Sequence, residues 1–151
     1  MHREKGHFSN WRHKTRSLGL DIGDKRIGVA LSDPGGVLAS PLTIIERSGE
    51  SADVEAITSI IHQHQVGRVI VGLPRSMDGS IGRQAEKVKS FVQGLHNQTH
   101  APVEFRDERL TTVSARRLMR EAAAGKSRRR VRDDAVAAAL ILQGYLDEIH
   151  E

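Results

Sequence analysis

The stretch that decides the fold is Ser17-Leu-Gly-Leu-Asp-Ile-Gly23, followed after two residues by Arg26-Ile-Gly-Val-Ala-Leu-Ser32. The first segment alternates in the manner of a β-strand, which puts Leu18, Leu20 and Ile22 on one face. The two residues between the segments are enough for a tight turn only. We therefore predict a pair of antiparallel strands at the start of the ordered chain.

Downstream, the hydrophobic pattern changes from strands to an alternation of helices and strands. The remaining predicted elements are a strand over 41–46, a helix over 51–65, a strand over 68–74, a helix over 81–95, a strand over 103–108, and helices over 112–124 and 134–149. The order is β-β-β-α-β-α-β-α-α, and strands reached by helical crossovers lie parallel to the first. The sequence thus predicts an α/β fold, a mixed five-stranded sheet with helices on both faces.

Length and composition bound the class of protein. The chain has 151 residues, 38% of them hydrophobic and 28% charged, which is typical of one globular domain. It has no cysteine, which excludes disulfides, thiolate metal sites and cysteine nucleophiles. The longest purely apolar run, 135–142, is far shorter than the roughly 20 residues of a membrane span. No apolar stretch follows the basic N-terminus, so we expect a cytoplasmic protein without a secretory signal.

The net charge of +4 is unevenly distributed. Residues 1–17 hold five basic residues and one acid, while the rest of the chain is neutral as a whole. We expect residues 1–16 to form a basic tail without a fold of its own, and 17–151 to form the folded domain. The segment Lys126-Ser-Arg-Arg-Arg-Val-Arg132 concentrates five cations in seven positions, which suits either phosphate contact or a solvated loop.

Acidic residues follow the predicted strands where a site is expected in an α/β sheet, beyond the carboxyl ends of parallel strands. Asp21 ends the first strand, Asp107 and Glu108 end the fifth, and Asp133 and Asp134 open the last helix. Clustered carboxylates are the ligands of hard cations such as Mg²⁺, and two such ions can support phosphodiester cleavage. The sequence therefore predicts a metal-dependent site at this edge.

Structural alternatives exist for each acid. Asp107 or Glu108 could pair with a neighbouring arginine, and Asp133 or Asp134 could be a helix N-cap. Asp21 is harder to explain, because an unpaired carboxylate in an apolar strand is costly. The histidines, including His62 and His64, fit solvated surface positions better than a metal site.

Four motifs carry a resemblance to a known family. They are Gly19-Leu-Asp-Ile-Gly-Asp-Lys-Arg-Ile-Gly-Val-Ala30, Val71-Gly-Leu-Pro-Arg-Ser-Met-Asp-Gly79, Asp107-Glu-Arg-Leu-Thr-Thr112, and the basic segment leading into Asp134-Ala-Val-Ala-Ala-Ala-Leu-Ile-Leu-Gln143. From Leu18 to its C-terminus the chain resembles the YqgF/RuvX family of pre-16S rRNA nucleases, also described as Holliday-junction-resolvase-like.

The resemblance implies a ribonuclease H-like fold and metal-dependent phosphodiester cleavage. It implies catalytic and metal-binding roles for Asp21, Glu108 and the aspartate that opens the last helix. Counting back from Leu140-Ile-Leu-Gln143 puts that role on Asp134, with Asp133 as the alternative. The cofactor would be Mg²⁺ or Mn²⁺. The predicted phosphate-binding residues are Arg26, Arg109, Lys126, Arg128, Arg129, Arg130 and Arg132.

Three functions remain open at this point. The first is a nuclease that acts on structured RNA and matures the 5′ end of pre-16S rRNA, with the ribosomal precursor particle as a partner. The second is a branched-DNA nuclease, which would require a two-fold homodimer. The third is a non-catalytic RNA-binding module of ribosome assembly, although acids repel phosphate unless a metal intervenes. An actin-like kinase would need a second lobe. With three Phe, one Trp and one Tyr, a base-stacking platform is not expected.

Overall fold

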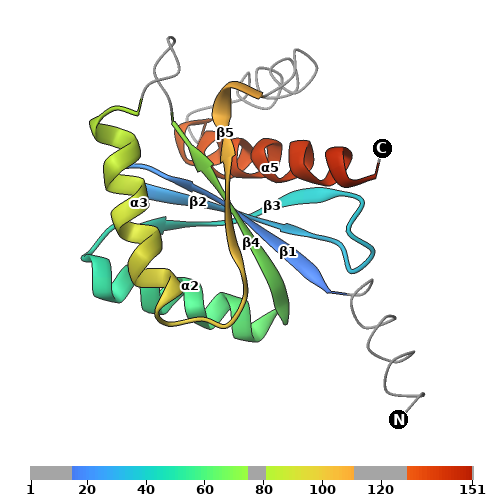
Figure 1. Ribbon diagram of the computed structural model, residues 1–151, viewed down its shortest axis with the longest axis horizontal. Helices are drawn as coiled ribbons and strands as arrows, with labels where there is room; N and C mark the ends of the chain where they lie inside the picture. Colours follow the sequence, from blue (N-terminus) through green and yellow to red (C-terminus); the bar gives the residue numbers. More distant parts are fainter. Residues whose placement is uncertain (1–14, 75–80, 111–128, 151) are drawn as a thin grey trace.

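The computed structural model describes residues 15–74, 81–110 and 129–150, with side chains at all of these positions except 109 and 129–133. A five-stranded sheet in the order β3-β2-β1-β4-β5 is covered by α5 on one face and by α2 and α3 on the other (Figure 1). The strands are β1 (Arg16–Ile22), β2 (Arg26–Ser32), β3 (Ala39–Glu46), β4 (Val66–Leu73) and β5 (Val103–Asp107). The helices are α2 (Glu50–Gln63), α3 (Arg83–His96), the 3₁₀ turn η1 (Glu108–Leu110) and α5 (Arg129–Ile149). The predicted mixed five-stranded α/β sheet is confirmed.

The pairing of the strands brings three chain segments to one edge of the sheet. β1 pairs antiparallel with β2, and β2 pairs antiparallel with β3. β1 is parallel to β4, which is parallel to β5. The last residues of the parallel strands, Ile22, Leu73 and Asp107, therefore lie at the same edge, which we call the carboxyl edge.

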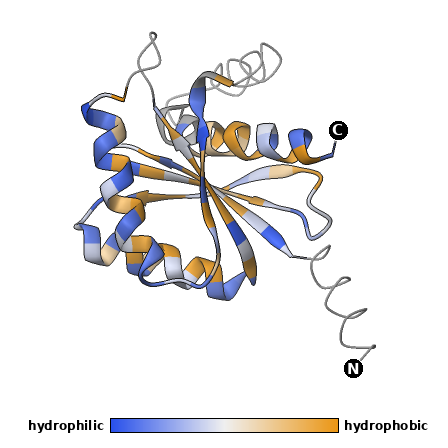
Figure 2. Cartoon of the chain, in the orientation of Figure 1, coloured by the Kyte–Doolittle hydropathy of each residue, from blue (hydrophilic) through white to orange (hydrophobic). Residues whose placement is uncertain are grey.

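Two apolar cores lie on the two faces of the sheet. Leu18, Leu20 and Ile22 of β1 belong to the larger core under α2 and α3, as their alternation predicts. The second core lies under α5 and contains Ala138 and Leu142 of that helix. Figure 2 shows hydrophobic residues along the strands and on the helix surfaces that face them. The odd-numbered residues of β1, Gly19 and Asp21, therefore belong to the α5 face.

Several boundaries differ from the prediction, most of all at α5. This helix begins at Arg129, five residues before the predicted start at residue 134. Arginine is a good helix former, so a cluster of charges does not by itself make a loop. The prediction that Asp133 and Asp134 open the helix is therefore wrong, and neither residue is an N-cap. Of the predicted basic loop, 129–132 is helical, while 126–128 lies outside the described residues.

The remaining predictions differ less from the structure or concern residues that it does not describe. Glu108 lies in η1 rather than in β5, and β3 begins at Ala39, two residues before its predicted start. The helix predicted over 112–124 and residues 1–14 of the predicted tail lie outside the described part of the chain. None of the helices within the described ranges has the length and apolarity needed to span a bilayer.

Candidate active site

Asp21 is the penultimate residue of β1 and lies opposite Gly28 of β2. Burial, together with the neighbouring charges of Glu108 and Asp134, raises the pKa of Asp21 to about 7. A hydrogen bond links the Asp21 and Glu108 carboxyl groups. Two carboxyl groups can form such a bond only when one of them is protonated, so this pair shares a proton near neutral pH.

Glu108, the other member of this pair, is the first residue after β5. Burial raises its pKa, and the charge of Asp107 adds to this, whereas the hydrogen bond with Asp21 lowers it. Gly72 of β4 makes room for Glu108, because a β-carbon at this position would lie 3.0 Å from the Glu108 Oε2 atom.

Asp134 approaches from the second turn of α5. The Nε atom of Arg26 donates a hydrogen bond to its Oδ2 atom at 2.8 Å. This bond raises the pKa of Arg26 above its ordinary value. Arg26 therefore ties the beginning of β2 to α5 and compensates one of the three acidic charges at the site.

Glycines in the strands allow α5 to lie close to the acids. A β-carbon on Gly28 would lie 1.8 Å from the backbone oxygen of Asp134, and one on Gly19 would lie 2.8 Å from the backbone oxygen of Ala138. Such contacts are impossible, so only glycine permits this approach. Sequence reasoning missed this role, although a glycine inside a strand is a known signal of close backbone approach.

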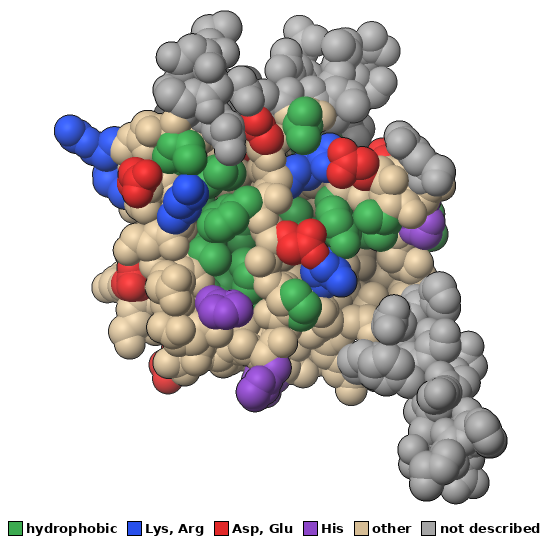
Figure 3. Space-filling model, in the orientation of Figure 1, with side chains coloured by type: hydrophobic (Ala, Val, Ile, Leu, Met, Phe, Trp, Pro, Cys, Tyr) green, Lys and Arg blue, Asp and Glu red, His purple; other side chains and the backbone are tan. Residues whose placement is uncertain are grey.

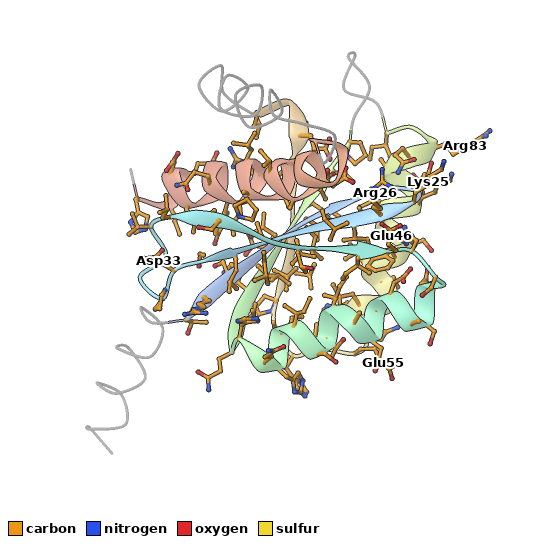
Figure 4. All side chains as sticks on the ribbon, turned by 180° about the vertical axis from the view of Figure 1, so that it is seen from behind. Lys25, Arg26, Asp33, Glu46, Glu55 and Arg83 are labelled. Carbon is orange, nitrogen blue, oxygen red and sulfur yellow. The ribbon has the colours of Figure 1, made fainter. Side chains whose placement is uncertain are left out.

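The predicted site residues fall into three groups. Glu108 and Asp134 both act electrostatically on Asp21, and Arg26 contacts Asp134. Arg129, Arg130 and Arg132 lie in the first turn of α5, and Arg109 lies in η1, with no side chain described. Lys126 and Arg128 lie outside the described residues. Figure 4 labels Lys25, Arg26 and Arg83 at the same end of the molecule, with Asp33 at the other.

Four of the described histidines lie at the opposite edge. His62 and His64 come directly before β4, and His96 and His100 come before β5, at the amino ends of the parallel strands. The expectation that they are not metal ligands agrees with this position. A groove of about 950 Å³ between α2 and α3, lined by residues such as Val54, Thr58 and Gly94, is also separate from the three acids.

The donor set at the carboxyl edge consists of carboxylate oxygens, which Mg²⁺ and Mn²⁺ prefer. Within 15–74, 81–110 and 129–150, no three acidic or histidine side chains are already arranged as a complete metal-binding group. A cation bound to Asp21 and Glu108 would replace the proton that they share, because the cation and the proton each neutralise negative charge on the two carboxyl groups. Asp21 and Glu108 thus offer the type of donor atom that a hard cation takes, while no third acidic ligand is arranged with them among the described residues.

Acidic and basic side chains alternate on the face over β5 and α5 (Figure 3). Two ion pairs link described residues of these elements to their neighbours, Arg68 with Glu104 and Arg106 with Glu148. Compensated charges of this kind give little attraction for a polyanion.

A family model and curated relatives indicate the same family for this chain. Residues 15–148 match the RuvX family model, described as Holliday junction resolvase. A curated protein of Moorella thermoacetica named "Putative pre-16S rRNA nuclease" is 50% identical over 134 residues, which are 89% of this chain and 96% of the relative. One of the same name from Dehalococcoides mccartyi is 51% identical over 127 residues, 84% of this chain and 94% of the relative.

Solved structures share the fold at low identity. T. thermophilus RuvC in complex with a Holliday junction substrate has a TM-score of 0.63 at 13% identity, covering 89% of this chain and 96% of that chain. The fowlpox virus resolvase with its substrate Holliday junction DNA has a TM-score of 0.56 at 13% identity, covering 91% and 100%. The ribonuclease H-like fold implied by the resemblance is confirmed.

Proposed function

The chain belongs to the RuvX family of nucleases, and from this premise we propose that it hydrolyses phosphodiester bonds in structured RNA, with Asp21, Glu108 and Asp134 as its catalytic and metal-binding residues. The proposed substrate is the 5′ region of pre-16S rRNA. The observation that carries this proposal is the hydrogen bond between the carboxyl groups of Asp21 and Glu108, together with the effect of the Asp134 charge on Asp21.

Each residue has a distinct task in this proposal. Asp21 of β1 and Glu108 of η1 would hold the cation, and Asp134 extends the acidic site toward α5. When bound, Mg²⁺ or Mn²⁺ supplies an activated water and stabilises the leaving oxygen. Arg26 holds Asp134 in place and can bind a substrate phosphate beside it. The first turn of α5 and the preceding segment, with Lys126, Arg128, Arg129, Arg130 and Arg132, together with Arg109, supply further phosphate contacts.

RNA is favoured over branched DNA as the substrate by the relatives. The curated proteins that carry the pre-16S rRNA nuclease name are about half identical to this chain over nearly their whole length. The structures bound to Holliday junctions are 13% identical, and that likeness speaks only for the fold. The family description as Holliday junction resolvase keeps branched DNA as the second candidate. We propose that the protein acts in the cytoplasm, where ribosomal precursor particles would be its partners.

The experiment compares cleavage of a pre-16S rRNA 5′ fragment and of a four-way DNA junction, each with and without Mg²⁺ or Mn²⁺. We expect ion-dependent cleavage of the RNA. Asp21→Asn keeps the shape of the side chain and should lower the cleavage rate at least about 100-fold, because it removes a carboxylate ligand of the cation that stabilises transition-state charge.

The matched control is Glu55→Gln, which removes one acidic charge from the exposed surface of α2 (Figure 4). It should leave the rate unchanged. Full activity of Asp21→Asn would refute the assignment of the acids. Junction cleavage without RNA cleavage would favour the second candidate, and RNA binding without cleavage under any ion would favour a non-catalytic module.

A further inference from the structure

We propose that Arg47 is a positioning residue of the active site, which holds the turn between β1 and β2 and thereby the places of Asp21 and Arg26. Arg47 follows β3 directly and contacts this turn twice. Its backbone N–H donates a hydrogen bond to the carbonyl oxygen of Lys25 at 2.9 Å. Its Nη1 atom donates one to the carbonyl oxygen of Gly23 at 2.8 Å. The inference rests on the proposed function, since it assigns a task within that site.

The turn connects two members of the site. Asp21 lies two residues before Gly23, and Arg26 follows Lys25 directly. Within the turn, the Gly23 N–H donates to the carbonyl oxygen of Arg26 at 2.9 Å. A displacement of this turn would therefore move the Asp21 carboxyl group away from Glu108 and the Arg26 guanidinium away from Asp134.

Arg47 is itself fixed from two other elements. Its Nε atom donates to the Oδ2 atom of Asp53 in α2 at 2.8 Å. Its guanidinium carbon lies 5.1 Å from the centre of the Phe91 ring of α3, within the range of a cation–π contact. The side chain thus joins the turn to both helices on the face of the sheet opposite to α5.

Asp53 is a charged residue in the core, with only 1% of its surface exposed. Burial would raise its pKa, but hydrogen bonds from Arg47 and from the Ser48 backbone N–H outweigh burial and lower the pKa. Asp53 is therefore ionised at neutral pH and needs Arg47 as its counterion.

A buried ion pair is weak evidence for a stabilising role, because an apolar pair of similar volume often serves stability equally well. An apolar side chain at position 47 could not donate a hydrogen bond to Gly23. The other ion pair at the turn, Lys87 with Asp24 at 3.5 Å, is 55% and 65% exposed and holds the turn weakly. The geometry at Arg47 is thus explained by placement of the turn rather than by stability.

The test uses the double variant Arg47→Met/Asp53→Asn, which removes the buried charge of Asp53 together with that of its counterion and keeps an acceptor for Ser48. We expect a folded protein whose kcat for RNA cleavage falls about 10- to 100-fold, as small misplacements of catalytic groups produce. KM and the Kd for uncleaved RNA should change much less than kcat, because Arg47 does not touch substrate and Arg26 alone among the proposed phosphate contacts depends on this turn. The control Arg68→Met removes a cation at the opposite edge and should keep full kcat.

Arg47→Lys keeps the charge beside Asp53 but lacks the planar fork that binds Asp53 and Gly23 together. It should fold and show an intermediate kcat. It therefore decides the question if the double variant fails to fold: wild-type kcat in Arg47→Lys would overturn the proposal, as would wild-type kcat in a folded double variant.

Amide hydrogen exchange at Gly23 provides a readout that does not depend on activity. In both variants the Gly23 N–H should exchange faster than in the wild-type protein, because its turn is no longer held. Unchanged exchange would overturn the positioning role even if kcat fell. If the wild-type protein cleaves no RNA while Gly23 exchange still accelerates in the variants, the proposed substrate is wrong and Arg47 nevertheless positions the turn.

Discussion

Asp21 keeps its proton to a pH near 7 because its carboxyl group is buried and because the charges of Glu108 and Asp134 lie near it. The same residue in an unfolded chain would lose its proton near pH 4. The folded, metal-free protein thus carries an electrostatic cost that comes from its candidate site. This cost can be measured without any knowledge of the substrate.

Between about pH 4 and pH 7, the folded state holds a proton on Asp21 that the unfolded state has released. The free energy of unfolding of the metal-free protein should therefore fall as the pH rises through this window, by up to about 4 kcal/mol for a shift of three pKa units. Urea unfolding at several pH values in the presence of a chelator measures this fall. Asp21→Asn should show a clearly weaker fall, and an identical pH profile in that variant would contradict the pKa of Asp21.

A divalent ion bound at Asp21 competes with this proton. Added Mg²⁺ should raise the Tm of the wild-type protein more at pH 8 than at pH 5, since an ion that binds only the folded state stabilises it by mass action. Thermal melts of wild-type and Asp21→Asn proteins at both pH values measure the effect. Equal Mg²⁺ stabilisation of the two proteins at pH 8 would show that the ion binds elsewhere.

At the scale of secondary structure, the approach of α5 to the sheet decides whether the acids can act together. Gly19 of β1 and Gly28 of β2 present no side chain toward this helix, so its backbone lies directly on the strands. The Asp134 side chain then accepts a hydrogen bond from Arg26, and its charge acts on Asp21. The three acids therefore come together only when α5 packs directly against β1 and β2.

Gly28→Ala should displace α5, because the new β-carbon would meet the rigid backbone of Asp134 rather than a flexible side chain. We expect a loss of about 1–3 kcal/mol of stability, as in other overpacked cores, and a large loss of RNA cleavage. Denaturant unfolding and the cleavage assay measure the two effects. The matched control is Gly94→Ala, whose β-carbon would lie 3.3 Å from the Oε2 atom of Glu50, a side chain that can move. Wild-type cleavage by Gly28→Ala would show that the position of α5 does not limit catalysis.

The beginning of α5 belongs to the proposed phosphate-binding segment. Replacing Arg128, Arg129 and Arg130 with alanine should weaken RNA binding and make its salt dependence less steep, by about one unit of slope for each phosphate that is no longer bound. Fluorescence titrations between low and physiological salt measure both quantities. Unchanged affinity and slope would mean that these cations are only solvated.

At the scale of the whole molecule, one chain contains all three acids, so the proposed RNA cleavage needs no second copy. The cleavage rate per protomer should therefore stay constant when the protein concentration is varied across any dimerisation transition. Analytical ultracentrifugation beside the cleavage assay tests this expectation. A rate that appears only in a two-fold dimer, together with paired cuts in a four-way junction, would favour the DNA candidate.

The sequence by itself determined the sheet and the edge at which the acids gather. Alternation in β1 fixed which face carries Leu18, Leu20 and Ile22, and the helical crossovers required β4 and β5 to run parallel to β1. Parallel strands end at the same edge, so Asp21 and Glu108 were predicted to meet. These inferences succeed because they depend on local periodicity and on the geometry of short connections.

Only the tertiary structure decided how the charges are arranged within that edge. The contact of Arg26 with Asp134 joins residues 108 positions apart, and Arg47 contacts both the buried Asp53 of α2 and the Phe91 ring of α3. The start of α5 and the proton shared by Asp21 and Glu108 were likewise not predictable. Partner choice and pKa depend on burial and on distances of a few ångströms between distant segments, and these quantities exist only once the chain is packed.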